Sequence, residues 1–254
     1  MPAAVTSTQS EAAQFLLHQI QRARALRKTH RTDPERAAAR HALREWQAAR
    51  LARTHRDLLE DPRYRPAAEY FLAELYGTKD TSARDAAVER MHGTLARRMP
   101  PAALHTLGLA LELDALSEEL DAELLDALAQ EGGAGRSLNE SVYAAAYRRC
   151  DNFALRERQI ELIHDLGNEL AAVVRKPLVH TLLKAMRLPA KLAGLGDLQS
   201  FLERGFEAFL HMGDATAFFL ETVRSRESTI LQRIYAGHPE PFAVEGTAEP
   251  SGRA

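Results

Sequence analysis

Two short motifs in the sequence pair a glutamate with a histidine three residues later. They are Glu89 with His92 and Glu161 with His164. Residues three apart on a helix lie on one face, so each pair can offer a carboxylate and an imidazole to the same metal ion. Helical di-iron proteins use two such pairs together with one glutamate from each of two other helices. The pattern therefore suggests a helical-bundle, metal-dependent enzyme with iron or manganese as its cofactor.

The placement of the other carboxylates weakens this hypothesis. Glu74 and Glu119 would complete the set, but Glu74 and Glu89 are too close in sequence for the chain to cross between two full bundle helices. Each histidine also lies one position away from the apolar stripe of its helix. With ten histidines and 35 acidic residues, such pairs are expected by chance. We therefore expect no catalytic residue and no cofactor, and keep the metal enzyme as the alternative.

A stripe of basic residues is the stronger candidate for binding. Residues 170–196 contain five Lys or Arg and no acidic residue. Steps of three or four positions place the following residues on one side of a helix: Lys176, His180, Lys184, Arg187 and Lys191. Pro189 interrupts this spacing before its last member. A basic amphipathic helix of this kind suits an acidic protein, a nucleic-acid backbone or an anionic membrane surface.

Charge is segregated along the chain although the net charge is only -2. Residues 21–56 contain eleven Lys or Arg against three acids, whereas residues 101–135 contain eight acids and no Lys or Arg. These segments can pair within the fold or present charged faces to a partner. Trp46 is the only aromatic residue in the first basic segment, which argues against a stacking platform for nucleic acid.

These charges favour a non-enzymatic helical interaction or scaffold protein that binds an acidic or anionic partner. The partner would be another protein or a second copy of the chain. Peripheral association with a membrane surface is a weaker alternative, and nucleic acid is weaker still.

Helices must position all of these residues, because the periodic segments of the sequence have helical spacing. Ala and Leu dominate and β-branched residues are scarce, which favours helix over strand. No segment alternates apolar and polar residues over the length of a strand. The expected fold class is all-α, a bundle-like body of about nine to ten helices with a disordered C-terminal tail.

The expected organisation is one helical domain over residues 10–236. A flexible segment at 1–9 precedes it, and a disordered tail rich in turn-forming residues follows at 237–254. Glycines at 132–135 are a point where the body could divide into two parts. The first residues lack a secretory pattern, and uncharged runs are shorter than the about 20 residues that span a membrane. The expected location is the cytoplasm.

A short apolar helix carries the only family-like motif in the chain. Residues 70–77 read Tyr-Phe-Leu-Ala-Glu-Leu-Tyr-Gly, after Asp-Pro-Arg-Tyr-Arg-Pro at 61–66 and before Arg-Asp at 84–85. This order resembles an uncharacterised bacterial protein family named for an FFLEELY motif, from which Tyr70 and Ala73 depart. The similarity extends over about residues 10–235. The resemblance implies a recurring helical domain and carries over no functional residue.

Glu74 is the charged exception within this motif. Because an unpaired buried carboxylate is costly, we expect it to form a buried ion pair. The arginines near it in sequence are Arg63, Arg65 and Arg84. A structural ion pair is preferred here over a role in ligand binding.

Overall fold

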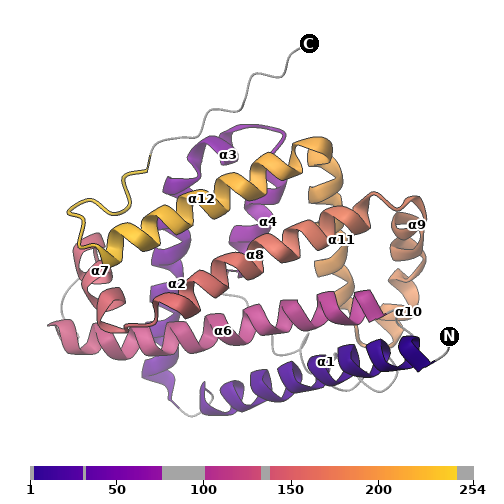
Figure 1. Cartoon of the computed structure of the whole chain (residues 1–254), viewed down its shortest axis with the longest axis horizontal. Coiled ribbons are helices and arrows are strands. Elements are labelled where there is room, and N and C mark those ends of the chain that lie inside the picture. The colour runs from indigo at the N-terminus through magenta and orange to yellow at the C-terminus, as the bar shows by residue number, and fades with distance from the viewer. Residues whose placement is uncertain (1–2, 31–32, 76–100, 133–137, 245–254) are drawn as a thin grey trace.

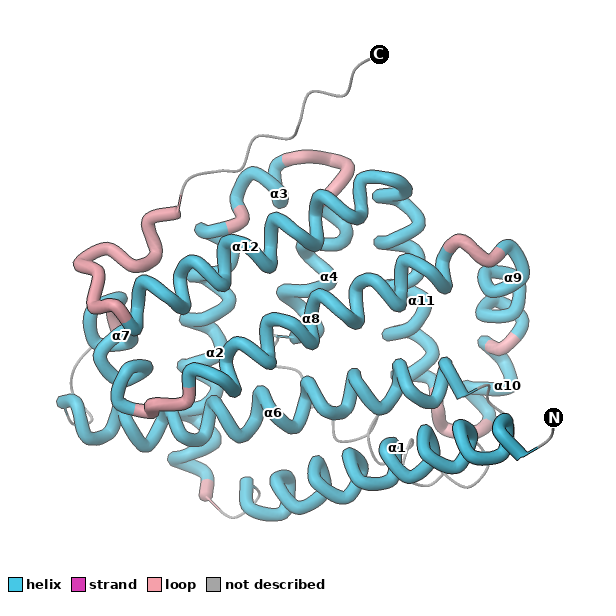
Figure 2. The backbone as a smooth tube through the Cα atoms, viewed as in Figure 1, coloured by secondary structure: helices cyan, strands magenta, loops and turns pink. Residues whose placement is uncertain are grey.

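The computed structural model describes residues 3–30, 33–75, 101–132 and 138–244 of the protein. Over these ranges the chain is helical and forms no strand, which confirms the all-α fold class. The helices are joined mostly by short loops (Figure 2). Their bounds are α1 Ala3–His30, α2 Pro34–Thr54, α3 Arg56–Glu60, α4 Arg65–Leu75, α6 Pro101–Gly132, α7 Glu140–Arg149, α8 Phe153–Val174, α9 Pro177–Ala185, α10 Arg187–Leu192, α11 Gly196–Met212 and α12 Thr216–Tyr235, with a 3-10 turn at Gly213–Ala215.

Several helix starts follow caps that are visible in the sequence. The Asp33 side chain accepts a hydrogen bond from the Arg36 backbone N–H at the start of α2, and Pro34 occupies the first turn. Asn139 caps α7 in the same way. The N-terminal helix begins earlier than expected, at Ala3, so residues 3–9 belong to α1.

Two helix breaks change the direction of the chain. α2 stops at Thr54, and α3 begins after His55, whose imidazole lies 3.0 Å from the Glu227 carboxylate. The helix that begins at Pro177 ends at Ala185, and α10 follows after Met186. The first break turns His55 toward the interior, and the second divides the predicted basic stripe.

Four long helices lie side by side across the molecule (Figure 1). The order is α1, α6, α8 and α12, with each helix packed against the next. α2, α4 and α11 run across this layer, and α4 packs against α11. Helices from before and after residue 133 therefore pack together.

Aromatic residues from distant parts of the chain form one of the cores. Phe206, Phe209 and Phe219 are buried together with Tyr64, and the Phe71 ring lies 5.7 Å from the Phe219 ring. These rings join α4, α11 and α12. Phe206 and Phe209 of α11 thus meet Phe219 of α12 across the α11–α12 hairpin, and α4 packs onto them.

The acidic and basic segments near the N-terminus pair with each other. Arg22 of α1 binds Glu119 of α6, and Arg36 of α2 lies 2.6 Å from Asp126. Arg40 and Arg44 of α2 both bind Glu118. The first basic segment is therefore largely neutralised within the fold.

The body extends beyond the last helix. Phe242 packs against Trp46 and Tyr143, with ring centroids 6.1 Å and 6.0 Å away. Pro241 is buried. Residues 238–244, which the sequence assigns to the tail, thus contact α2 and α7. Among the described residues, no helix is long and apolar enough to cross a membrane.

Gly167 of α8 packs directly against the Leu220 side chain of α12. A Cβ atom at this position would lie 2.3 Å from Cδ2 of the buried Leu220. We expect Gly167→Ala to lower the free energy of unfolding by about 1–3 kcal/mol, because an overpacked core strains its neighbours. Gly196→Ala is the control, since nothing lies within 4 Å of the added carbon. Urea unfolding curves that coincide for the two variants would contradict this packing.

Candidate functional site

Helices α9 and α10 form an edge of the molecule and carry the predicted basic stripe (Figure 1). Lys176 precedes α9, Lys184 lies in its last turn, and Lys191 lies in the last turn of α10. These three lysines are exposed and form no ion pair with any described residue. They are the part of the stripe that is available to a partner.

The other two members of the stripe face neighbouring side chains. The Nε of Arg187 donates to Glu203 at 2.7 Å, which raises the pKa of this arginine. The His180 ring stacks on Phe206 with centroids 5.2 Å apart and an angle of 13° between the planes. Arg187 is thus neutralised by α11, and His180 contributes to packing.

Leucines on the same two helices point away from the core. Leu178 and Leu182 are 80% and 61% exposed, and Leu188 and Leu192 are 64% and 80% exposed. Of the apolar residues of α9, Val179 and Leu183 pack against the main aromatic core. The sequence indicated an apolar face here but not that much of it lies in solvent. We call these four leucines with Lys176, Lys184 and Lys191 the α9–α10 surface.

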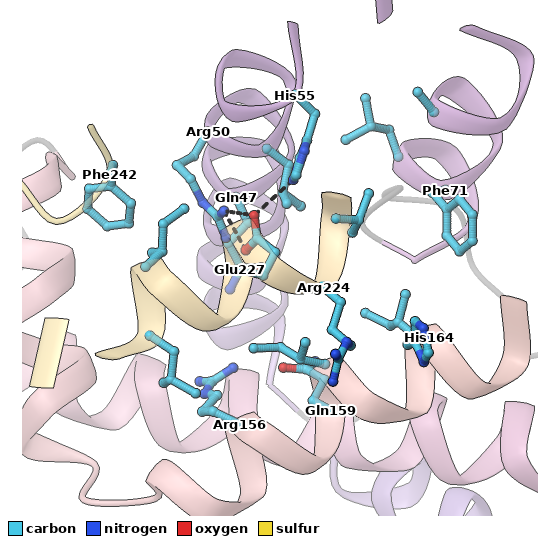
Figure 3. Close-up of a pocket in the computed structure, with 18 of the residues that line it drawn as sticks. Gln47, Arg50, His55, Phe71, Arg156, Gln159, His164, Arg224, Glu227 and Phe242 are labelled. Carbon is cyan, nitrogen blue, oxygen red and sulfur yellow. Dashed lines mark hydrogen bonds and ion pairs between the residues drawn. The ribbon is translucent and has the colours of Figure 1, made fainter. Parts of the chain in front are cut away.

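A second candidate site is a cavity of about 90 Å³ in the centre of the molecule (Figure 3). Polar side chains line it from several helices, among them Gln47 and Arg50 from α2, Asp121 from α6, Arg156 and Gln159 from α8, and Glu227 from α12. Apolar residues such as Leu51, Phe219 and Ile230 form much of the remaining wall. The cavity thus combines charge with apolar surface.

Glu227 is held by Arg50 and His55 on one side of this cavity. Nη1 of Arg50 donates to both of its carboxylate oxygens at 2.7 and 2.6 Å, and Nε2 of His55 lies 3.0 Å away. Burial alone would raise the pKa of Glu227, but Arg50 and His55 lower it to about 2. The carboxylate therefore stays ionised in the interior at neutral pH.

Asp121 is engaged on the α6 side of the cavity. Its Oδ1 accepts from the Gln47 amide at 3.1 Å, and its Oδ2 accepts from Arg44 at 3.2 Å. Arg156 on α8 has no such carboxylate: its Nη2 donates to the Leu120 carbonyl at 2.9 Å. Sequence analysis missed Arg156, although it lies four residues before Ile160 on the apolar stripe of α8. The signal in the sequence that could have identified Arg156 is a charged residue at a position of α8 that is otherwise apolar.

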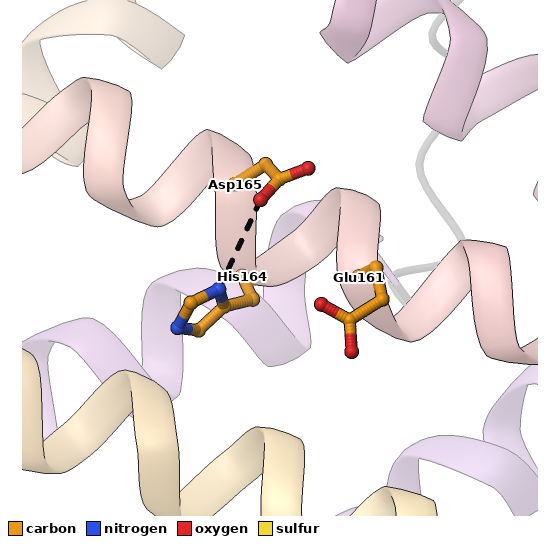
Figure 4. Close-up of side chains that lie close together, drawn as sticks. All are labelled: Glu161, His164 and Asp165. Carbon is orange, nitrogen blue, oxygen red and sulfur yellow. Dashed lines mark ion pairs between the residues drawn. The ribbon is translucent and has the colours of Figure 1, made fainter.

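One of the two Glu-x-x-His motifs lies in the described part of the chain (Figure 4). Ligand atoms of Glu161, His164 and Asp165 lie within 4.8 Å of one another. Glu161 already accepts from Arg224 at 3.1 Å, and His164 lies 3.9 Å from both Asp165 and Glu221. Glu89 and His92 lie outside the described residues. The convergence of the two motifs therefore stays a prediction.

The ion pair predicted for Glu74 also stays a prediction, because its side chain and Arg84 lie outside the described residues. Arg63 binds Asp61 at 3.0 Å, and Arg65 donates to the carbonyl groups of Leu59 and Glu60. Both arginines thus hold the turn that precedes α4.

These features define an all-α protein with a basic and apolar edge and a polar internal cavity. Residues 26–241 match the model of a family described as a domain of unknown function, DUF8198. This match covers most of the chain, so the protein belongs to that family. No curated protein and no solved structure matches the chain.

The low pKa of Glu227 predicts how stability depends on pH. Because the pKa falls from 4.5 to about 2 on folding, the stabilisation is complete above pH 4.5 and is lost as pH falls toward 2. Glu227→Gln should remove about 3 kcal/mol from the free energy of unfolding at neutral pH, and its stability should change less over this acidic range.

Urea unfolding at several pH values measures both effects. Glu157→Gln is the control, because Glu157 is exposed on α8, and its cost should be below about 0.5 kcal/mol. Parallel pH profiles for the wild type and Glu227→Gln would show that this carboxylate does not carry the predicted linkage.

Proposed function

We propose that the protein is a non-enzymatic interaction protein whose α9–α10 surface binds an acidic, amphipathic segment of a protein partner. The observation that carries this proposal is the combination of four largely exposed leucines with three lysines that form no internal ion pair. Protein interfaces combine an apolar centre with a polar rim, and extended apolar exposure is unusual on a surface without a partner.

The charges elsewhere in the fold support this choice of surface. The first basic segment already has its counter-charges on α6, through pairs such as Arg22 with Glu119 and Arg44 with Asp121. Lys176, Lys184 and Lys191 form no such ion pair with a described residue, although Glu203, which binds Arg187, also acts on Lys184 at longer range. An acidic partner would therefore be steered to α9 and α10.

The spacing of the leucines fits a helical partner. Leu178 and Leu182 are four residues apart on α9, and Leu188 and Leu192 are four apart on α10. An amphipathic helix presents its own apolar residues at the same spacing. Glutamates along the edges of such a helix would meet the lysines.

A membrane surface is a weaker fit to the same residues. Each Lys or Arg near an anionic bilayer contributes only about 1 kcal/mol, and this surface has three free lysines. Glu203 of α11 lies beside them and binds Arg187. The exposed large apolar residues of α9 and α10 are leucines and Met186, without the aromatic residues that anchor proteins at membrane interfaces.

Binding of a designed helix tests the proposal. The probe is a fluorescent peptide of about 15 residues with leucines on one face and glutamates on the other. Fluorescence anisotropy should show micromolar binding, and Lys184→Glu with Lys191→Glu should weaken it at least about tenfold. Arg56→Glu is the control for a charge reversal outside this surface, because Arg56 is exposed on α3, and should leave binding unchanged.

Two outcomes would overturn the proposal. One is equal peptide binding by the lysine variant and the Arg56→Glu control. The other is flotation of the wild type with phosphatidylserine vesicles that Lys184→Glu abolishes, with no binding to the peptide. The second outcome would assign the surface to a membrane.

A metal-dependent reaction is the second candidate function, and the group of Glu161, His164 and Asp165 favours it. If the group forms a functional centre, purified protein loaded anaerobically with iron or manganese should retain about one equivalent, and His164→Ala should release it. Metal analysis that finds less than about 0.1 equivalent would exclude this function.

A further inference from the structure

Arg156 is a fully buried guanidinium without a carboxylate partner. Its side chain belongs to a residue that is 3% exposed. Nη2 donates to the Leu120 carbonyl, the guanidinium lies 4.4 Å from the centre of the Tyr147 ring, and buried Nε has no hydrogen-bond partner. One carbonyl and one aromatic face leave the charge only partly compensated.

The other buried arginines of the described chain are each paired with an acid. Arg50 binds Glu227, and Arg226 binds both oxygens of Asp57 at 2.7 and 2.6 Å. Because an unpaired buried charge is costly, proteins supply a counter-charge or leave room for one. In this fold the chain supplies one to Arg50 and Arg226 but not to Arg156.

The space beside Arg156 is the central cavity. Its volume of about 90 Å³ is smaller than the roughly 150 Å³ that accommodates benzene in an engineered protein cavity, and larger than the space of a single water molecule. Gln159 lies one turn along α8 on the same wall, and Leu51 and Ile230 line the cavity as apolar residues. The cavity therefore has room for a small molecule with one polar end.

The charges around the cavity leave one unit of positive charge without a contact partner. Glu227 is held by Arg50 and His55, and Asp121 is held by Arg44 and Gln47. Asp121 acts on Arg156 only at longer range. A monoanion would balance the site, whereas a dianion would introduce excess negative charge beside Glu227 and Asp121.

We propose that the central cavity binds a small monocarboxylic acid, with the carboxylate of the ligand paired to Arg156. The planar guanidinium of Arg156 lines the cavity and matches a carboxylate in shape and hydrogen-bond geometry, and its one described hydrogen bond goes to a neutral carbonyl group. The apolar walls suit a short hydrocarbon chain. This site is separate from the α9–α10 surface and does not depend on it.

Thermal unfolding with butyrate as the probe tests this site. Sodium butyrate at about ten times its dissociation constant should raise the midpoint of the wild-type protein by about 3–5 °C, relative to sodium chloride at equal ionic strength. Butanol has the same chain without the charge and should have no such effect. Arg156→Gln should abolish the shift. The control Arg158→Gln removes an exposed guanidinium of the same helix that pairs with Glu112, and should retain it.

If Arg156→Gln does not fold, direct binding of butyrate to the wild-type protein tests the proposal instead. The carboxyl-labelled ¹³C signal of butyrate should shift or broaden with wild-type protein, and Lys184→Glu with Lys191→Glu should leave this change intact. No change at tens of millimolar butyrate, roughly the weakest affinity of interest, would overturn the proposal. An equal thermal shift with chloride, or an unchanged shift in folded Arg156→Gln, would overturn it as well.

Discussion

The pairing of acidic α6 with the arginines of α1 and α2 is the interaction on which the rest of the structure depends. α6 carries acids along a helix that also has a buried leucine stripe, so it must pack and be neutralised at once. Arg22, Arg40 and Arg44 meet both needs by bringing two basic helices onto it. Because these pairs are partly shielded from solvent, salt screens them less than surface pairs. Without these ion pairs the acidic side chains of α6 would repel one another.

A consequence of this pairing is that the fold decides which basic residues remain for a partner. Charge counted along the sequence places the largest basic excess at residues 21–56. In the folded chain much of that excess faces α6, and the lysines of α9 and α10 are left in solvent. The net charge of the whole chain is therefore a poor guide to what this protein binds. The charge that remains unpaired on each face of the folded chain is a better guide.

Sequence patterns predicted the helices well and the interior poorly. Caps such as Asp33 and Asn139 act locally, so their effect can be read from neighbouring residues. The break at His55 depends instead on Glu227, 172 positions away, and no local pattern reveals it. The sequence likewise placed Leu182 on an apolar face, but whether that face is covered depends on α11. The burial of Arg156 follows from α6, α7 and α8 meeting, which spacing within one helix cannot show.

The two candidate sites are connected through α8 and through the aromatic core, where Phe71 and Phe219 line the cavity and belong to the same cluster as Val179 and Leu183 of α9. Arg156 lies near the start of α8, and Val174 ends this helix about 27 Å further along at 1.5 Å per residue. Lys176 follows two residues after that end. α8 is continuous over that distance and is packed against α6 and α12. A ligand that displaced α8 as a unit would strain the contact of Gly167 with Leu220. Coupling between the cavity and the α9–α10 surface would therefore pass through the aromatic core, whose side chains contact both.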